Sequence, residues 1–324
     1  MPVKTHSGTI PAAIRRMASE YGIAIALLIE IILFSQLSPY FFTTENILNV
    51  SLQVSITAIM AAGMTFVILT SGIDLSVGAL VAISGVVATN FLKLPLPFAA
   101  SLIVAVAAGL LIGTLSGSVA GLFITKFRIT PFIVTLALMT IWRGTAYMVT
   151  DGRPVWGLPE QFNVLGSGRL LEIPIPTIIM VCVYVAAYIV LKKTRFGRYV
   201  YAVGGNHEAA RLSGIHTTRI IIGVYSISGM LSALSGVLLA SRMNSGQPNA
   251  GLMYELDVIA AVVVGGTSLL GGRGSIVGTF LGAMLIGILR NGLNLINVSS
   301  YVQMVVLGGV ILFAVMLDQI KKRT

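Results

Sequence analysis

The chain has 324 residues, of which 56% are hydrophobic and only 10% are charged. A soluble domain carries about 25% charged residues, and a soluble protein of this length could not hide so much apolar surface, so a soluble fold is excluded. A formal net charge of +10 on a soluble chain would suggest nucleic-acid binding. Here the Lys and Arg residues fall mostly in short loops and tails, so we expect contact with membrane lipid and no nucleic-acid partner.

The apolar segments are long enough to be helices that cross a membrane. A helical span needs about 20 apolar residues to cross ~30 Å of hydrocarbon, and long continuous runs exclude the alternating strands of a barrel. We therefore expect an all-helical integral membrane protein with about ten transmembrane helices. These spans are expected, in chain order, at residues 21–38, 50–70, 75–92, 98–121, 131–150, 174–191, 220–242, 255–270, 275–296 and 302–317.

The basic residues predict the orientation of the chain. Cytoplasmic loops of membrane proteins carry an excess of Lys and Arg, and most of the 21 basic residues fall in cytosolic segments if both termini lie inside. We therefore expect a cytosolic tail at 1–20, one transmembrane domain at 21–317 and a cytosolic tail at 318–324. The loop 192–219 is expected in the cytosol, and segment 151–173 outside.

Two hairpins, at residues 70–78 and 265–275, are rich in glycine and small polar residues. Irregular backbone at a membrane boundary is tolerated where it faces protein or a water-filled cavity. We expect Asp74 to order its own hairpin.

Catalytic motifs are missing from the sequence. The three histidines, His6, His207 and His216, have no metal-ligand spacing, and neither a G-x-S-x-G elbow nor a G-x-x-x-x-G-K-[ST] phosphate loop occurs. We therefore expect no enzyme, no metal site and no cofactor in this chain. If ATP drives the protein, a separate subunit must bind and hydrolyse it.

The loop 192–219 is expected to contain a short helix outside the membrane. Asn206 can cap it, Glu208 in its first turn suits the helix dipole, and Gly214 can end it in a left-handed conformation. Ala209, Ala210 and Leu212 would give it a small, smooth surface. From these residues alone, a solvated connector is an equally good interpretation.

Four segments together carry a family resemblance: residues 67–78, 204–215, 254–268 and 291–301. Through them the chain resembles the permease subunits of ribose-type ABC importers, which serve monosaccharides, and the likeness covers all but the N-terminal tail. The resemblance implies a bacterial inner-membrane permease that works by alternating access. It also implies three kinds of partner: a cytosolic ABC ATPase, a periplasmic sugar-binding protein and a second permease subunit, most simply another copy of this chain.

The segment 204–215 is similar to the coupling helix of that family, which docks in a groove of the ATPase. The residues that the resemblance assigns to ATPase coupling are Gly204, Gly205, Asn206, Glu208, Ala209, Ala210 and Gly214.

Polar residues inside the spans are costly and therefore functional or paired. Arg143 and Arg290 could pair with an acid and fix helix packing. Asn291 and Asn294 are three residues apart and share one helix face. We expect that face to line the external end of a sugar path, with hydrogen bonding between helices as an equally open alternative.

Other functions remain open at this stage. A related permease could carry another small polar solute, such as autoinducer-2 or a nucleoside. An ion-coupled secondary transporter or a passive channel would also lack a phosphate loop, but neither would need a coupling segment.

Overall fold

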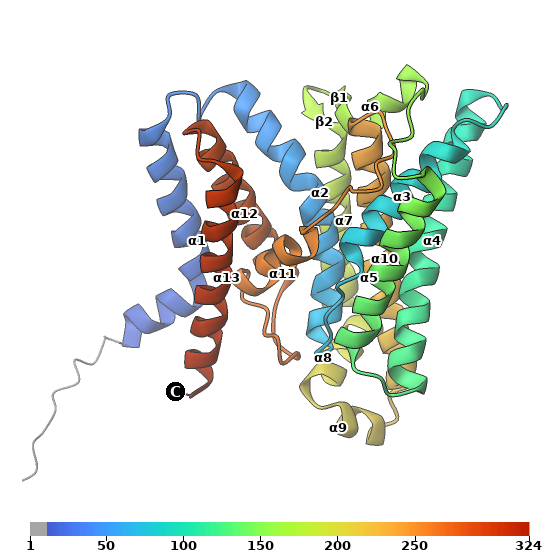
Figure 1. The fold of residues 1–324 in the computed structure, drawn as a ribbon. Helices are drawn as coiled ribbons and strands as arrows, with labels where there is room; N and C mark the ends of the chain where they lie inside the picture. The colour runs from blue at the N-terminus through green and yellow to red at the C-terminus, as the bar shows by residue number, and fades with distance from the viewer. Residues whose placement is uncertain (1–11, 324) are drawn as a thin grey trace, which may run out of the picture.

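The computed structural model describes residues 12–323, and it is built almost entirely of helices (Figure 1). Among the described residues, six helices are long and apolar enough to cross a membrane. They are α2 (Thr44–Leu69), α4 (Phe98–Lys126), α5 (Pro131–Thr150), α7 (Ile175–Lys193), α10 (Thr217–Arg242) and α12 (Ile276–Leu295). The prediction of an all-helical membrane protein is confirmed, whereas the count of ten spans is not.

Shorter apolar helices account for most of the remaining expected spans. They are Gly22–Leu37 within α1 (Ala12–Leu37), α3 (Val77–Phe91) and Ser300–Phe313 within α13 (Ser300–Arg323). The expected N-terminal tail lies outside the described residues over positions 1–11.

Two ends of the molecule carry the irregular and short elements. At one end, beyond α5, lie η1 (Glu160–Phe162), α6 (Asn163–Ser167) and the antiparallel pair β1 (Arg169–Leu170) and β2 (Ile173–Pro174). At the opposite end lie α8 (Arg195–Gly205), α9 (His207–Leu212) and the C-terminal end of α13 (Figure 1).

Helices α2 and α10 form the centre of the protein. The buried core includes most of the C-terminal half of α2, and α10 packs against α2, α3 and α4. The α4–α10 contact depends on small residues, because a side-chain carbon at Gly113 would overlap the backbone of Gly229. Close backbone approach of this kind is how helices associate in lipid, where water supplies no driving force.

Helix α11 (Tyr254–Val264) is shorter than the span expected at 255–270. Its 11 residues rise only about 16 Å, roughly half of the hydrocarbon thickness. The helix ends because Gly265 is followed by Gly266, whose φ of 84° leaves the helical region. The chain then runs as an irregular loop to Ser275, which caps α12 by accepting a hydrogen bond from the Gly278 amide.

The hairpin between α2 and α3 is ordered by Asp74, as the sequence predicts. This side chain is buried and accepts hydrogen bonds from the Ser76 amide (3.0 Å), the Ser76 hydroxyl (2.6 Å) and the Ser228 hydroxyl (2.9 Å). Because Ser228 lies on α10, Asp74 also attaches the hairpin to the centre of the protein.

Candidate functional site

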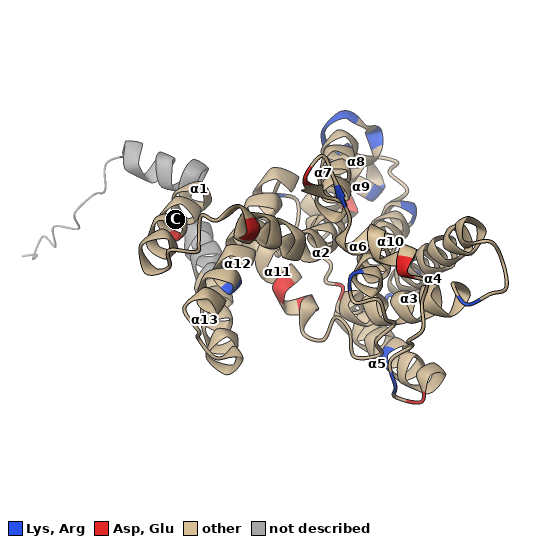
Figure 2. Cartoon of the chain, turned by 90° about the horizontal axis from the view of Figure 1, so that it is seen from above, with Lys and Arg blue, Asp and Glu red and all other residues tan. Residues whose placement is uncertain are grey.

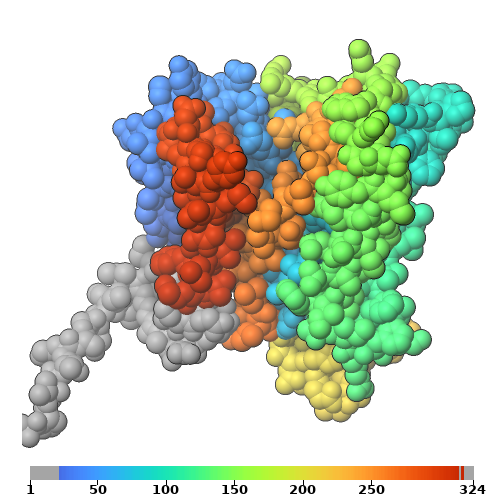
Figure 3. All heavy atoms as spheres, viewed as in Figure 1, coloured from blue at the N-terminus to red at the C-terminus, as the bar shows by residue number. Residues whose placement is uncertain are grey.

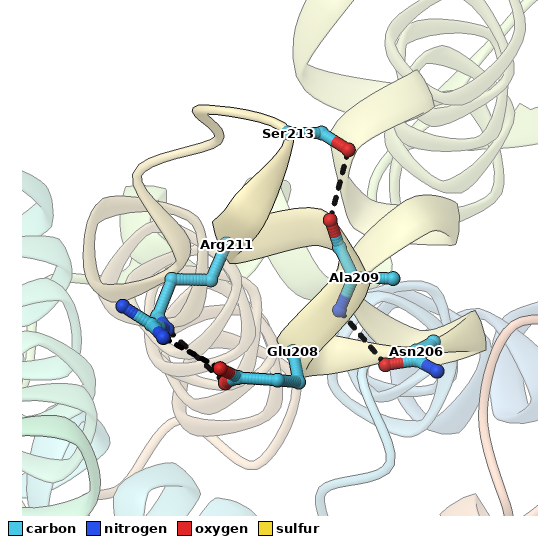
Figure 4. Close-up of polar contacts among 5 residues, drawn as sticks. All are labelled: Asn206, Glu208, Ala209, Arg211 and Ser213. Carbon is cyan, nitrogen blue, oxygen red and sulfur yellow. Dashed lines mark hydrogen bonds and ion pairs between the residues drawn. The ribbon is translucent and has the colours of Figure 1, made fainter.

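The segment 204–215 contains the short helix that the sequence predicts. Helix α8 ends at Gly205, and the extended backbone of Asn206 turns the chain into α9. The Asn206 side chain accepts a hydrogen bond from the Ala209 amide at 2.9 Å (Figure 4), which caps the new helix. Gly214, with a φ of 83°, ends α9, and the Ile215 amide donates to the Ala210 carbonyl at 3.1 Å.

An exposed ion pair crosses the outer face of α9. Arg211 donates two hydrogen bonds to the Glu208 carboxylate, the one from Nε at 3.1 Å (Figure 4). These bonds from Arg211 hold the pKa of the Glu208 carboxyl below its usual value. Figure 2 shows blue segments gathered near α7, α8 and α9. This end of the protein has a positive surface, made by the exposed basic residues Lys192, Lys193, Arg195, Arg198 and Arg211.

The two alanines of α9 point in different directions. Ala209 is exposed, whereas Ala210 is 5% exposed and belongs to the protein's own core. Leu212, at 74% exposed, is the large apolar side chain that α9 presents to its surroundings. In this chain the methyl group of Ala210 therefore packs within the protein and Ala209 is the exposed alanine, while the assignment of both residues to ATPase coupling stays a prediction.

Gly204 also faces inward, at a junction of three backbone segments. A side-chain carbon at Gly204 would overlap the Leu69 carbonyl at the end of α2. The same carbonyl accepts a hydrogen bond from the Gly272 amide at 2.9 Å, and the Ser71 hydroxyl donates to the Leu270 carbonyl at 2.7 Å. The two glycine-rich hairpins of the sequence therefore meet each other and the end of α8, and we call this contact the three-segment junction.

Two arginines within the helices have hydrogen-bond partners of different kinds. Arg290 of α12 donates to Asp257 of α11 at 2.7 Å, so it pairs with an acid and joins two helices. Arg143 of α5 instead donates to the backbone carbonyls of Pro248 and Ala250, at 3.0 and 2.6 Å. It fixes the loop that precedes α11.

Asn291 and Asn294 both make hydrogen bonds to neighbouring helices. The Asn291 side chain exchanges two hydrogen bonds with Asn46 of α2, at 2.8 and 3.1 Å. Asn294 accepts a hydrogen bond from Gln303 of α13 at 2.8 Å. Hydrogen bonding between helices, the alternative left open by the sequence, is therefore present at both side chains, and their place on a sugar path stays a prediction.

A cavity of about 250 Å³ lies between α2, α10, α11 and α12. Its lining mixes polar and apolar side chains: Gln53, Val54, Ile56, Thr57, Leu239, Arg242, Tyr254, Asp257, Ile286, Gly287 and Arg290. Of these residues, the sequence singles out Arg290 but does not bring the site together. A usable signal exists, because Gln53 and Thr57 are four residues apart and place two polar groups on one face of a helix expected to span the membrane.

A family model described as the permease component of branched-chain amino acid transport systems matches residues 46–315. The chain belongs to this family of membrane permease components, and with its long apolar helices it is a multi-pass membrane protein.

Known relatives match the chain over nearly its whole length. It is 51% identical to the ribose import permease protein RbsC of Escherichia coli strain K12, over 92% of this chain and 93% of the relative. It is 50% identical to the RbsC protein of Bacillus subtilis strain 168, over 93% and 92%. Identity to the L-arabinose transport system permease protein AraH of Escherichia coli strain K12 is 39%, over 95% and 93%. No solved structure shows significant similarity to the chain.

Proposed function

We propose that this chain is the permease subunit of an ATP-driven ABC importer that moves ribose or a similar monosaccharide across the bacterial inner membrane. The observation that carries the proposal is the identity of about half of all residues, over more than nine-tenths of the chain, to two ribose import permeases. Identity to the L-arabinose permease is lower, at 39%, which favours ribose within the sugar class.

The proposal requires ATP hydrolysis by a separate subunit, because the sequence has no phosphate loop. We assign the docking surface for that ATPase to α9, with Ala209 and Leu212 as its exposed small and apolar side chains. The capped, glycine-terminated shape of α9 supports the assignment. A periplasmic sugar-binding protein and a second permease subunit complete the proposed complex, which works by alternating access.

We further propose that the chain crosses the membrane about ten times, with both termini and the loop 192–219 in the cytosol. The domain division into tails at 1–20 and 318–324 around one transmembrane domain follows from the same topology. The basic surface over α7, α8 and α9 supports this orientation (Figure 2), as does the position of segment 151–173 at the opposite end of the molecule (Figure 1).

Reconstitution of the complex tests the proposed function. Vesicles that contain this chain with its ATPase should accumulate ribose only when ATP and the loaded binding protein are both supplied. The chain alone should neither hydrolyse ATP nor accumulate sugar. Accumulation by the chain alone, driven by a proton or sodium gradient, would contradict the proposal and favour a secondary transporter. Uptake of autoinducer-2 or a nucleoside in place of ribose would keep the ABC importer assignment and replace the proposed substrate.

An Ala209→Glu substitution should separate the permease from its ATPase. The change adds bulk and a charge to an exposed position, so the chain itself should remain folded, with a stability change within about 0.5 kcal/mol. In a docked interface, a mispaired charge can cost several kcal/mol. We therefore expect loss of ATPase co-purification and of ribose uptake together.

The matched control is Ala99→Glu, the same change at an exposed position in the first turn of α4, which should leave both readouts at the wild-type level. Ala210→Glu should instead destabilise the permease itself, because Ala210 is buried. Normal ATPase binding and uptake by Ala209→Glu would contradict the docking assignment.

Single cysteines should report the proposed orientation. In a Cys182→Ala background, Ser167→Cys should react with an impermeant thiol reagent in intact cells, whereas Thr218→Cys should react only after the cells are opened. Both positions are exposed in the structure, so lack of labelling reports the side of the membrane. Labelling of Thr218→Cys in intact cells would reverse the topology.

A further inference from the structure

We propose that the cavity between α2, α10, α11 and α12 is a transient binding site for a neutral, polyhydroxylated sugar within this subunit. The proposal rests on the proposed function and gives it a location. The site differs from the path expected at Asn291 and Asn294, whose side chains are engaged with neighbouring helices.

The size of the cavity suits one small solute. At ~30 Å³ for each water molecule in the liquid, its volume of about 250 Å³ corresponds to roughly eight waters. That space admits a monosaccharide and excludes an oligosaccharide. On one face of the molecule, residues of α11 and the loop after it reach the surface between α13 and α5 (Figure 3).

The polar groups of the lining match the hydrogen-bonding needs of a polyol. Gln53 offers both donors and an acceptor, and Tyr254 adds a phenol. The Thr57 hydroxyl donates to the Val54 carbonyl at 3.2 Å, so it offers the ligand an acceptor. Within the described part of the chain, neither Asp257 Oδ2 nor Arg290 Nε has a hydrogen-bond partner, although both atoms are shielded from solvent. Because both atoms are out of reach of a ligand in this conformation, the hydrogen bonds to a sugar hydroxyl are assigned to Gln53, Thr57 and Tyr254.

The charges of the lining favour a neutral ligand. Asp257 and Arg290 compensate each other through their 2.7 Å ion pair. The remaining cation, Arg242, lies in the last turn of α10, where the free carbonyl groups of the helix end carry partial negative charge. Ile56, Leu239 and Ile286 provide apolar wall. Few fixed charges and a partly apolar wall give weak binding, which transport needs if the solute is to leave again.

The position of α11 connects this cavity to the proposed ATPase side. Tyr254 and Asp257, in the first turn of α11, line the cavity. The other end of α11 leads into the loop that contacts Leu69 and Gly204 at the three-segment junction. A shift of α9 that carried this loop would therefore move α11 and change the lining of the cavity.

Substrate protection tests the site in the assembled complex. Thr57→Cys is placed in a Cys182→Ala background, and its reaction with a small thiol reagent is measured during ATP turnover with ribose-loaded binding protein. We expect the thiol reaction to be at least about threefold slower with ribose than during turnover without sugar. The reason is that bound ribose blocks access of the reagent while it occupies the site. Thr114→Cys, on α4 and outside the lining, should react at one rate in both conditions.

Removal of one polar group gives a second readout. Gln53→Leu keeps the approximate volume of the side chain. Among the described residues Gln53 has no hydrogen-bond partner, so the substitution breaks no hydrogen bond within the protein. We expect ribose uptake to fall about fivefold, as for one lost hydrogen bond, while ATPase co-purification stays at the wild-type level. Thr114→Val is the control for a polar-to-apolar change in a helix outside the cavity.

The outcomes distinguish failure of the cavity proposal from failure of the proposed function. Unchanged Thr57→Cys labelling and unchanged Gln53→Leu uptake, in a complex that transports ribose, would overturn the cavity site alone. Protection by ribose 5-phosphate but not by ribose would overturn the assignment to a neutral sugar. Absence of ribose uptake by the wild-type complex would contradict the proposed function, and the cavity proposal would fall with it.

Discussion

Three backbone segments meet at the end of α2 with no space for side chains between them, and the arrangement of the functional parts depends on this contact. The Leu69 carbonyl accepts a hydrogen bond from the Gly272 amide, and Gly204 lies so close that any side chain there would overlap Leu69. Because packed backbones deform little, α8–α9 cannot move far without moving the loop between α11 and α12. The three-segment junction therefore provides a mechanical link between the exposed helix α9 and the half-length helix α11.

This link suggests how the work is divided within the proposed complex. Helix α9 exposes the side chains of Ala209 and Leu212. On its inner side, Ala210 packs in the core, and Gly204 just before the helix lies against Leu69. Helix α11 presents Asp257 to Arg290 and the cavity. The chain needs no catalytic group for this task, since ATP hydrolysis is proposed to occur elsewhere and this subunit only has to convert docking into a change of the cavity lining.

Local features of the sequence predicted local structure well. Asn206 and Gly214 define the two ends of α9 because capping depends on a few neighbouring residues, and Asp74 orders its hairpin for the same reason. Features that depend on distant contacts could not be predicted. The opposite directions of Ala209 and Ala210 follow from how α9 lies on the core, and the pairing of Asn291 with Asn46 joins residues 245 positions apart. The early end of α11 was missed because the apolar residues Leu269 and Leu270 follow the glycines and extend the expected span, whereas the positive φ of Gly266 shows where the helix stops.

The central claim is that α9 carries the contact between this permease and a cytosolic ATPase. Site-specific photo-crosslinking at Leu212 tests it most directly, because this side chain is 74% exposed and its replacement by a photoreactive residue disturbs no internal packing. In living cells we expect a covalent adduct with a soluble ATPase subunit, and none from the same photoreactive residue placed at the exposed position Ala99 of α4. An adduct with a periplasmic protein, or with lipid alone, would contradict it.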